Sequence, residues 1–144
     1  IVMHVYLLLQ PLNKLALQTD RPDIARRAGD IAQALFDAMF VDMDRSLREM
    51  GVSDISVGKR VKHMAKAFYG RVGAYDEGLA GADDVLGDAL ERNLFGTVNP
   101  TGEHVRAMVD YLRLQAAHMT TIPEAAVISG DMLFAPEPGK GVDR

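Results

Sequence analysis

The chain of 144 residues contains no cysteine and no tryptophan, and aromatic residues make up only 6% of it. Without cysteine it has no disulfide, thiolate nucleophile or cysteine metal site, which fits a reducing compartment. Its most apolar stretch, residues 1–9, is far shorter than the ~20 residues of a membrane-spanning helix. That stretch lacks the flanks of a signal peptide. It also lacks an N-cap, so we expect it to continue a helix that starts upstream.

Sequence motifs of catalysis and metal binding are missing as well. The chain has no Gly-x-Gly-x-x-Gly, Walker or Gly-x-Ser-x-Gly motif. Its histidines are scattered, and none has a carboxylate at metal-ligand spacing. These histidines are His4, His63, His104 and His118. We therefore predict no enzymatic activity, no metal site and no cofactor.

The apolar residues that are present amount to 48% of the chain and are mainly leucine, alanine, methionine and valine, a helical composition. No segment shows the apolar–polar alternation of a strand between hairpin turns. The sequence thus predicts an all-α, single-domain irregular bundle of about five to seven helices. We place the helical domain in residues 1–134. Residues 135–144, rich in proline, glycine and charge, are expected to be a disordered tail.

Apolar spacing of three or four residues places the first two helices. Residues 2–17 are apolar on almost every face, which predicts a helix buried on all sides. Pro11 is expected to kink this helix or to split it in two. The next helix covers residues 22–50 and is ended by Gly51, a residue suited to the position after a helix.

Shorter helices are predicted in the second half of the chain. Two of them cover residues 83–94 and 103–119. Thr121 and Glu124 have the spacing of a capping box, which would open a short last helix ending near Gly130.

Residues 56–79 are basic, although the whole chain has a formal net charge of −4. Because like charges repel, this helical segment is either a solvated face or a docking surface for an anionic partner. Its fixed positive charges are Lys59, Arg60, Lys62, Lys66 and Arg71. The three lysines follow one helix face, away from an apolar stripe that includes Val57 and Phe68.

A series of glycines begins within the basic segment: Gly70, Gly73, Gly78, Gly81 and Gly87. Each glycine inside a helix costs about 1 kcal/mol relative to alanine, so the series predicts a kink or a second helix packed very close. On this basis we expect Gly73→Leu to disrupt a close helix contact.

The chain has eight methionines, and Met39, Met43 and Met50 share one face of the predicted helix at residues 22–50. Methionine fills irregular gaps in a core, and it also suits grooves that accept varied apolar partners. Both interpretations stay open: core filling, or an adaptable groove for a hydrophobic client.

Several blocks are distinctive by their order and spacing. They are residues 4–9 (HVYLLL), 36–52 (FDAMFVDMDRSLREMGV), 56–62 (SVGKRVK), 68–71 (FYGR) and 74–76 (AYD). Together they resemble the ubiquinol–cytochrome c chaperone family, and the resemblance extends over residues 3–130. The composition looks like that of a bacterial relative.

The resemblance implies a non-enzymatic assembly factor for ubiquinol–cytochrome c reductase. Mitochondrial members of the family bind newly made cytochrome b, work near the ribosome and pair with a small partner protein. A relative in bacteria would be cytoplasmic and peripheral at the inner membrane, and one in eukaryotes would be in the mitochondrial matrix. The implied partners are a hydrophobic client such as cytochrome b, the ribosome or an anionic membrane surface, and a small partner protein, but not DNA.

The favoured hypothesis combines these observations. The basic face would dock ribosomal RNA or anionic lipid headgroups, and a neighbouring apolar groove would hold the client. Tyr69, Tyr75 and Asp76 would rim or brace this site, although Asp76 could instead pair with Arg71 or cap a turn.

Two alternatives remain open from the sequence. In a haem or small-molecule binding module, the basic residues would meet propionates and His63 or His104 would bind iron. A purely structural subunit is the third interpretation.

Overall fold

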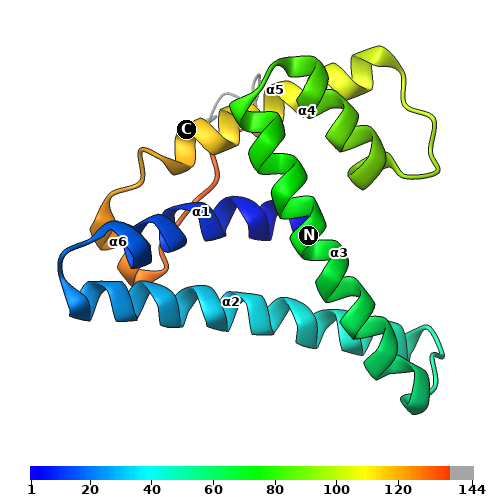
Figure 1. Ribbon diagram of the computed structural model, residues 1–144, viewed down its shortest axis with the longest axis horizontal. Coiled ribbons are helices and arrows are strands. Elements are labelled where there is room, and N and C mark those ends of the chain that lie inside the picture. Colours follow the sequence, from blue (N-terminus) through cyan, green and yellow to red (C-terminus); the bar gives the residue numbers. More distant parts are fainter. Residues whose placement is uncertain (137–144) are drawn as a thin grey trace, which may run out of the picture.

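The computed structural model describes residues 1–136, which form six α-helices and no strand (Figure 1). The helices are α1 (Val2–Gln18), α2 (Pro22–Glu49), α3 (Asp54–Ala80), α4 (Asp83–Leu90), α5 (Gly102–Met119) and α6 (Glu124–Ser129). A π-helical turn, η1 (Glu91–Phe95), continues α4. The all-α class and the helix number are therefore as predicted. The predicted tail falls mostly on residues 137–144, which lie outside the described residues.

Helix α1 lies at the centre of the molecule, alongside α2 and behind α3 in the view of Figure 1. Its buried residues lie between Met3 and Leu12 and include Tyr6 and Leu7. The second half emerges at the surface, where Leu17 is 84% exposed, so the prediction of burial on all sides was wrong for the last turns. The predicted split was also wrong, because α1 continues through Pro11. Proline lacks an N–H, so it cannot donate to the carbonyl of Leu7 in the preceding turn.

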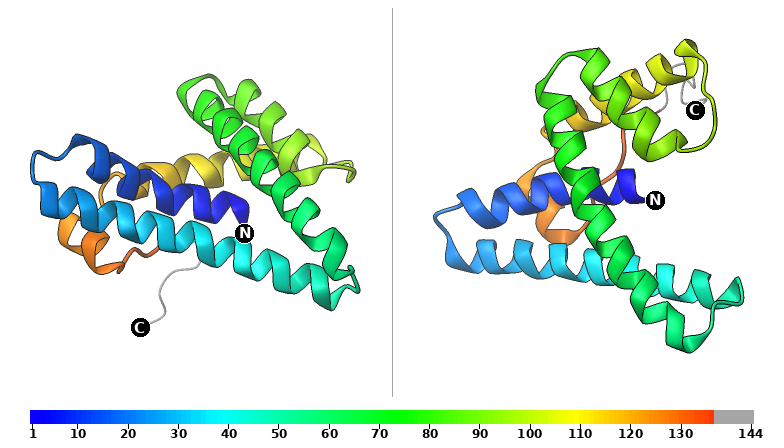
Figure 2. Two further views of the ribbon diagram at one scale, coloured as in Figure 1. Left: turned by 60° about the horizontal axis from the view of Figure 1, so that its bottom comes forward. Right: turned by 45° about the vertical axis from the view of Figure 1, so that its right-hand side comes forward.

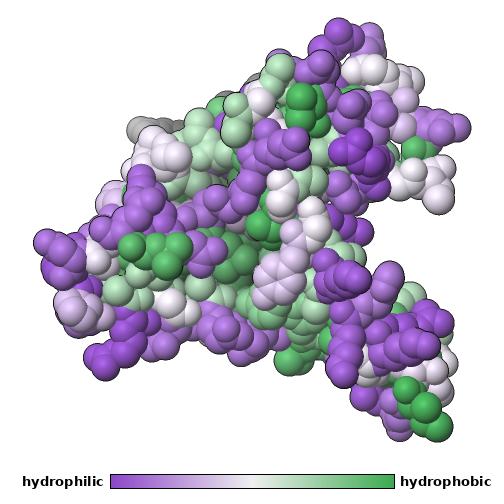
Figure 3. Space-filling model, in the orientation of Figure 1, coloured by the Kyte–Doolittle hydropathy of each residue, from purple (hydrophilic) through white to green (hydrophobic). Residues whose placement is uncertain are grey.

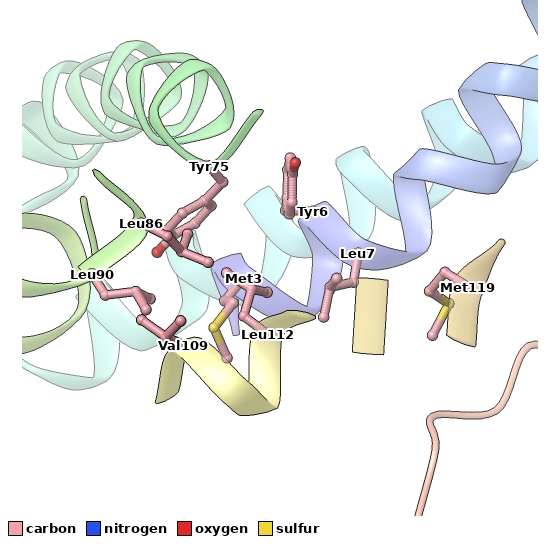
Figure 4. Close-up of a cluster of buried hydrophobic side chains, with 9 residues drawn as sticks. All are labelled: Met3, Tyr6, Leu7, Tyr75, Leu86, Leu90, Val109, Leu112 and Met119. Carbon is pink, nitrogen blue, oxygen red and sulfur yellow. The ribbon is translucent and has the colours of Figure 1, made fainter. Parts of the chain in front are cut away.

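The core consists of two apolar clusters, and both contain residues of α1. The first joins α1 to α3, α4 and α5, and Figure 4 shows its side chains converging from all four helices. Its members are Met3, Tyr6, Leu7, Tyr75, Leu86, Leu90, Val109, Leu112 and Met119. The second cluster joins α1 to α2, α3 and α6 through residues such as Leu12, Met39 and Phe68. Because both clusters include α1, this helix holds the two halves of the bundle together.

Helices α3 and α4 meet at a very close crossing. A Cβ added to Gly78 would lie 2.8 Å from Leu86 Cδ1 and 2.9 Å from Leu86 Cα, so no larger residue fits there. A Cβ on Gly73 would meet nothing within 4 Å. The prediction of a closely packed glycine was therefore right for Gly78 but wrong for Gly70 and Gly73, which lie on the exposed side of α3.

Arg113 of α5 fastens the same crossing from the outside. Its guanidinium donates to the Asp83 carboxylate at 2.6 Å and to the carbonyls of Leu79 and Gly81 at 3.2 and 2.9 Å. Carbonyls in the last turn of a helix have no partner within the helix. Arg113 supplies one and so holds the end of α3 against α4 and α5.

The chain after α5 returns along the molecule and is tied to it by a buried amide. The Gln115 side chain donates to the carbonyl of Ala135 and accepts from its N–H, both at 2.9 Å. Ala135, the first residue of the predicted tail, is thus held against α5. Thr121 forms no capping box, because its hydroxyl donates to the carbonyl of His118. The capping box of the structure lies at Thr101, where α5 begins.

Candidate partner-binding surface

A hollow of about 290 Å³ lies where α3 crosses α1 and α2. We call it the aromatic hollow, and its lining consists of Tyr6, Leu9, Gln10, Asn13, Gly29, Ala32, Gln33, Phe36, Phe68, Tyr69 and Val72. Figure 3 shows apolar surface, in green, between α1 and α2 up to α3. The hollow includes residues from three helices that are far apart in the sequence, so it exists only in the folded chain.

Aromatic rings form the wall of the hollow at α2 and α3. Phe36 of α2 lies edge-on to Phe68 with their ring centroids 5.5 Å apart, and its centroid is 5.9 Å from that of Tyr69. Phe68 is buried and anchors this wall in the core, whereas Tyr69 is 63% exposed. An exposed tyrosine beside a fixed aromatic wall offers both apolar area and a hydroxyl to a partner.

The predicted cations do not form one face. On a continuous helix with ~100° between residues, Lys59, Lys62 and Lys66 lie within ~60° of one another, and Tyr69 borders them. We call these three residues the lysine row. Arg60 and Arg71 lie on the opposite flank of the apolar stripe, ~140° away from the row. The predicted basic face is therefore divided in two, and the lysine row is the part beside Tyr69.

No carboxylate among residues 1–136 neutralises the lysine row. All three side chains are exposed, and none forms a salt bridge with any other residue among 1–136. The same holds for Arg60 and Arg71 within that range, although Arg71 is half-buried. Free cations that are held close together attract an anionic surface.

Tyr75 and Asp76, which were expected to rim or brace the site, both contact Tyr6, a residue that lines the aromatic hollow. Tyr75 is only 2% exposed and packs on Tyr6 with ring centroids 5.3 Å apart, so burial excludes the rim and leaves bracing as the prediction for this residue. Asp76 neither forms a salt bridge with Arg71 nor caps a turn. Its carboxylate accepts a hydrogen bond from the buried Tyr6 hydroxyl at 2.6 Å. Burial and this bond raise the pKa of Tyr6 well above its usual range. The bond ties α3 to α1 at the edge of the aromatic hollow.

A larger cavity that the sequence did not indicate lies at the other end of α1. Its volume is about 500 Å³, and α1, α5 and α6 line it with residues such as Leu15, Met119 and Val127. Lys14 and Glu124 reach its rim, and Glu124 pairs with Arg21 of the α1–α2 connection. None of the predicted site residues lines this cavity.

The histidines named for the haem alternative lie on different helices. His104 takes part in the capping box of α5, where its Nδ1 accepts from the Thr101 N–H at 3.3 Å. His63 is exposed on α3. Within residues 1–136, no three side chains of the metal-binding types cluster closely enough to hold an ion. His104 thus has a structural role in starting α5.

The pattern that defines the Ubiquinol-cytochrome C chaperone family matches residues 1–134. The chain belongs to this family. The resemblance expected from the sequence blocks is thereby confirmed. Among residues 1–136, no helix combines the length and the apolar composition that crossing a bilayer requires.

Named relatives share this region. Ubiquinol-cytochrome-c reductase complex assembly factor 1 of Xenopus laevis is 26% identical over 112 residues, which are 76% of this chain and 56% of the relative. Protein CBP3, mitochondrial, of Saccharomyces cerevisiae is 31% identical over 115 residues, 78% of this chain and 34% of CBP3. The crystal structure of the Cbp3 homolog from Brucella abortus matches with a TM-score of 0.77 at 31% identity, covering 94% of this chain and 70% of that chain. The chain thus spans between a third and just over half of these curated relatives.

Proposed function

We propose that the chain is a non-enzymatic assembly factor for ubiquinol–cytochrome c reductase that holds a hydrophobic subunit, cytochrome b, before the complex is complete. The observation that carries this proposal is the aromatic hollow with exposed Tyr69 beside the lysine row, which forms no salt bridge within residues 1–136. The hollow would take apolar side chains of the client. The lysine row would dock an anionic surface close to the place of synthesis, ribosomal RNA or lipid headgroups.

The size of the hollow favours a protein client over a bound small molecule. Pockets for drug-sized ligands have volumes of about 300–1,000 Å³, and the aromatic hollow is at the lower limit of that range. It can receive a few side chains of a segment laid across α1, α2 and α3, as helix-in-groove recognition requires. Burial of these side chains would supply the holding strength of the complex.

The names of the relatives support the same role. The family is described as a chaperone family, and the Xenopus laevis relative is named as an assembly factor of the reductase complex. The region shared with these relatives includes both α1 and α3, which contribute to the aromatic hollow. We infer that the family's client-binding surface lies in this shared region, at the cytoplasmic side of the inner membrane in a bacterial member.

A gene replacement tests the proposal. Deletion of the gene should lower the amount of assembled reductase, and a copy with Tyr69→Asp should fail to restore it, because the substitution places a charge on the apolar rim. Leu133→Asp is the matched control, since Leu133 is 73% exposed and outside the hollow. The amount of assembled complex is measured on native gels and by the haem spectra of membranes. Full restoration by Tyr69→Asp would contradict the role of the hollow.

A further inference from the structure

The connection between α2 and α3 exposes large apolar side chains. Met50 is 71% exposed and Ile55, in the first turn of α3, is 94% exposed. We call residues 50–56 the hairpin tip. Both views of Figure 2 show this end of the hairpin standing away from the other helices, and Figure 3 shows apolar surface among hydrophilic neighbours there. Neither of the two cavities described above includes a residue of the tip.

A tight turn gives the tip its shape. Gly51 has a positive φ of 84°, a conformation that other residues rarely adopt, and it reverses the chain directly after α2. Ser53 then starts α3 as its N-cap residue. The last turn of α2 and the first turn of α3 are thereby held at one end of the hairpin.

Cations outnumber carboxylates by one around the tip. Three of its four carboxylates are paired within the hairpin: Asp44 and Asp54 both bind Arg48, and Asp42 binds Arg45. Among the acids at residues 42–54, Glu49 forms no salt bridge within residues 1–136. Three cations that follow the tip along α3 also form no salt bridge within this range. These cations are Lys59, Arg60 and Lys62. Residues 42–62 carry five cations and four carboxylates, a net charge of +1, and the exposed apolar side chains lie at the tip.

We propose that the hairpin tip is a membrane-contact site that inserts Ile55 and Met50 into a bilayer rich in anionic lipids. The inference deepens the proposed function, because it assigns to one surface the anionic partner that the function requires. With the hairpin standing on its tip, Lys59 and Lys62 lie ~6 and ~10 Å along α3 from Ile55. Interfacial elements bury apolar residues ~5–10 Å into the headgroup boundary, which brings both lysines to the level of the phosphates.

The same features argue against nucleic acid as the partner of the tip. Ribosomal RNA would satisfy the cations through its phosphates, but an A-form surface offers no place for two exposed aliphatic side chains. A bilayer satisfies both at once, because the charged and the apolar layers lie at successive depths. With the hairpin upright, Tyr69 lies ~20 Å along α3 from Ile55, so the aromatic hollow would stand above the headgroups on the same side of the membrane.

The absence of tryptophan makes a direct test available. Ile55→Trp introduces one indole at the tip, and Leu17→Trp introduces one at an 84% exposed position at the far end of α1. The purified chain is mixed with vesicles of phosphatidylglycerol and phosphatidylcholine, and with vesicles of phosphatidylcholine alone. The tip indole should shift to the blue with anionic vesicles, whereas the control indole should not shift with either.

Vesicle flotation tests the energetic part of the inference. Met50→Ser with Ile55→Ser should lower the bound fraction at least fivefold, whereas Leu17→Ser should leave it unchanged, with equal helicity in all three proteins. An unchanged emission of Ile55→Trp, or equal flotation of the double variant, would overturn the inference and would leave a protein or RNA contact at the tip instead. No client is present in this assay, so its failure is separate from failure of the proposed function, which the gene replacement decides.

Discussion

Gly78→Ala is expected to lower the melting temperature by several degrees and to loosen the crossing of α3 and α4. The added Cβ would lie within 3 Å of both the side chain and the backbone of Leu86, and a backbone atom cannot rotate away. Overpacking of this kind costs about 1–3 kcal/mol. In a domain of this size each kcal/mol lowers the melting temperature by about 2–4 °C. Circular dichroism during heating gives the measurement.

Gly73→Ala is the matched control on the same helix. Its Cβ would meet nothing within 4 Å, and alanine is favoured over glycine inside a helix by about 0.5–1 kcal/mol. The control should therefore melt at the same or a slightly higher temperature. Equal melting of the two variants would show that α3 and α4 are not in close contact at Gly78.

Charge reversal in the lysine row is expected to have the largest effect on association. Lys59→Glu with Lys66→Glu should weaken binding to inner membranes and ribosomes at least tenfold at low salt, because it reverses the charge that attracts the anionic surface. The difference from the unmodified protein should shrink as salt is added. Co-sedimentation of the purified protein with each preparation gives the measurement. Helicity should stay intact, because both side chains are exposed on α3.

Arg26→Glu with Arg27→Glu changes the net charge by the same amount on α2. Both arginines are exposed, and neither forms a salt bridge within residues 1–136. This control should bind almost as well as the unmodified protein. Equal losses in the two double variants would mean that overall charge, rather than the lysine row, governs association.

Local patterns predicted most of the helices but not their contacts. Apolar spacing and terminal glycines gave the bounds of α2 and the position of α5 within a residue or two. Which glycine lies at a helix crossing depends on where α4 packs, and Gly73 and Gly78 are ~140° apart on α3. Helical spacing could have excluded Gly73, which lies seven residues after Lys66 on the lysine face, but it could not show that Gly78 meets Leu86. The sequence motif at Thr121 predicted a capping box that the structure does not form, because the motif alone cannot exclude a turn.

The candidate site was predictable in part. The exposed lysines followed from the sequence, and so could the burial of Tyr75, because it continues the stripe of Phe68 and Val72 at helical spacing. The partner of Asp76 could not be predicted, because Tyr6 is 70 residues away in the sequence. The aromatic hollow could not be predicted for the same reason, because its Phe36 and Phe68 come from different helices and meet only after folding.

The central claim, that the aromatic hollow holds a reductase subunit, is tested most directly by a photo-cross-linking amino acid placed at residue 69 in living cells. The side chain is exposed at the rim, so the probe should react with whatever occupies the hollow. We predict a cross-linked product that contains cytochrome b, and no such product from the same probe at residue 133. A probe at residue 69 that yields no product with any reductase subunit would contradict the account.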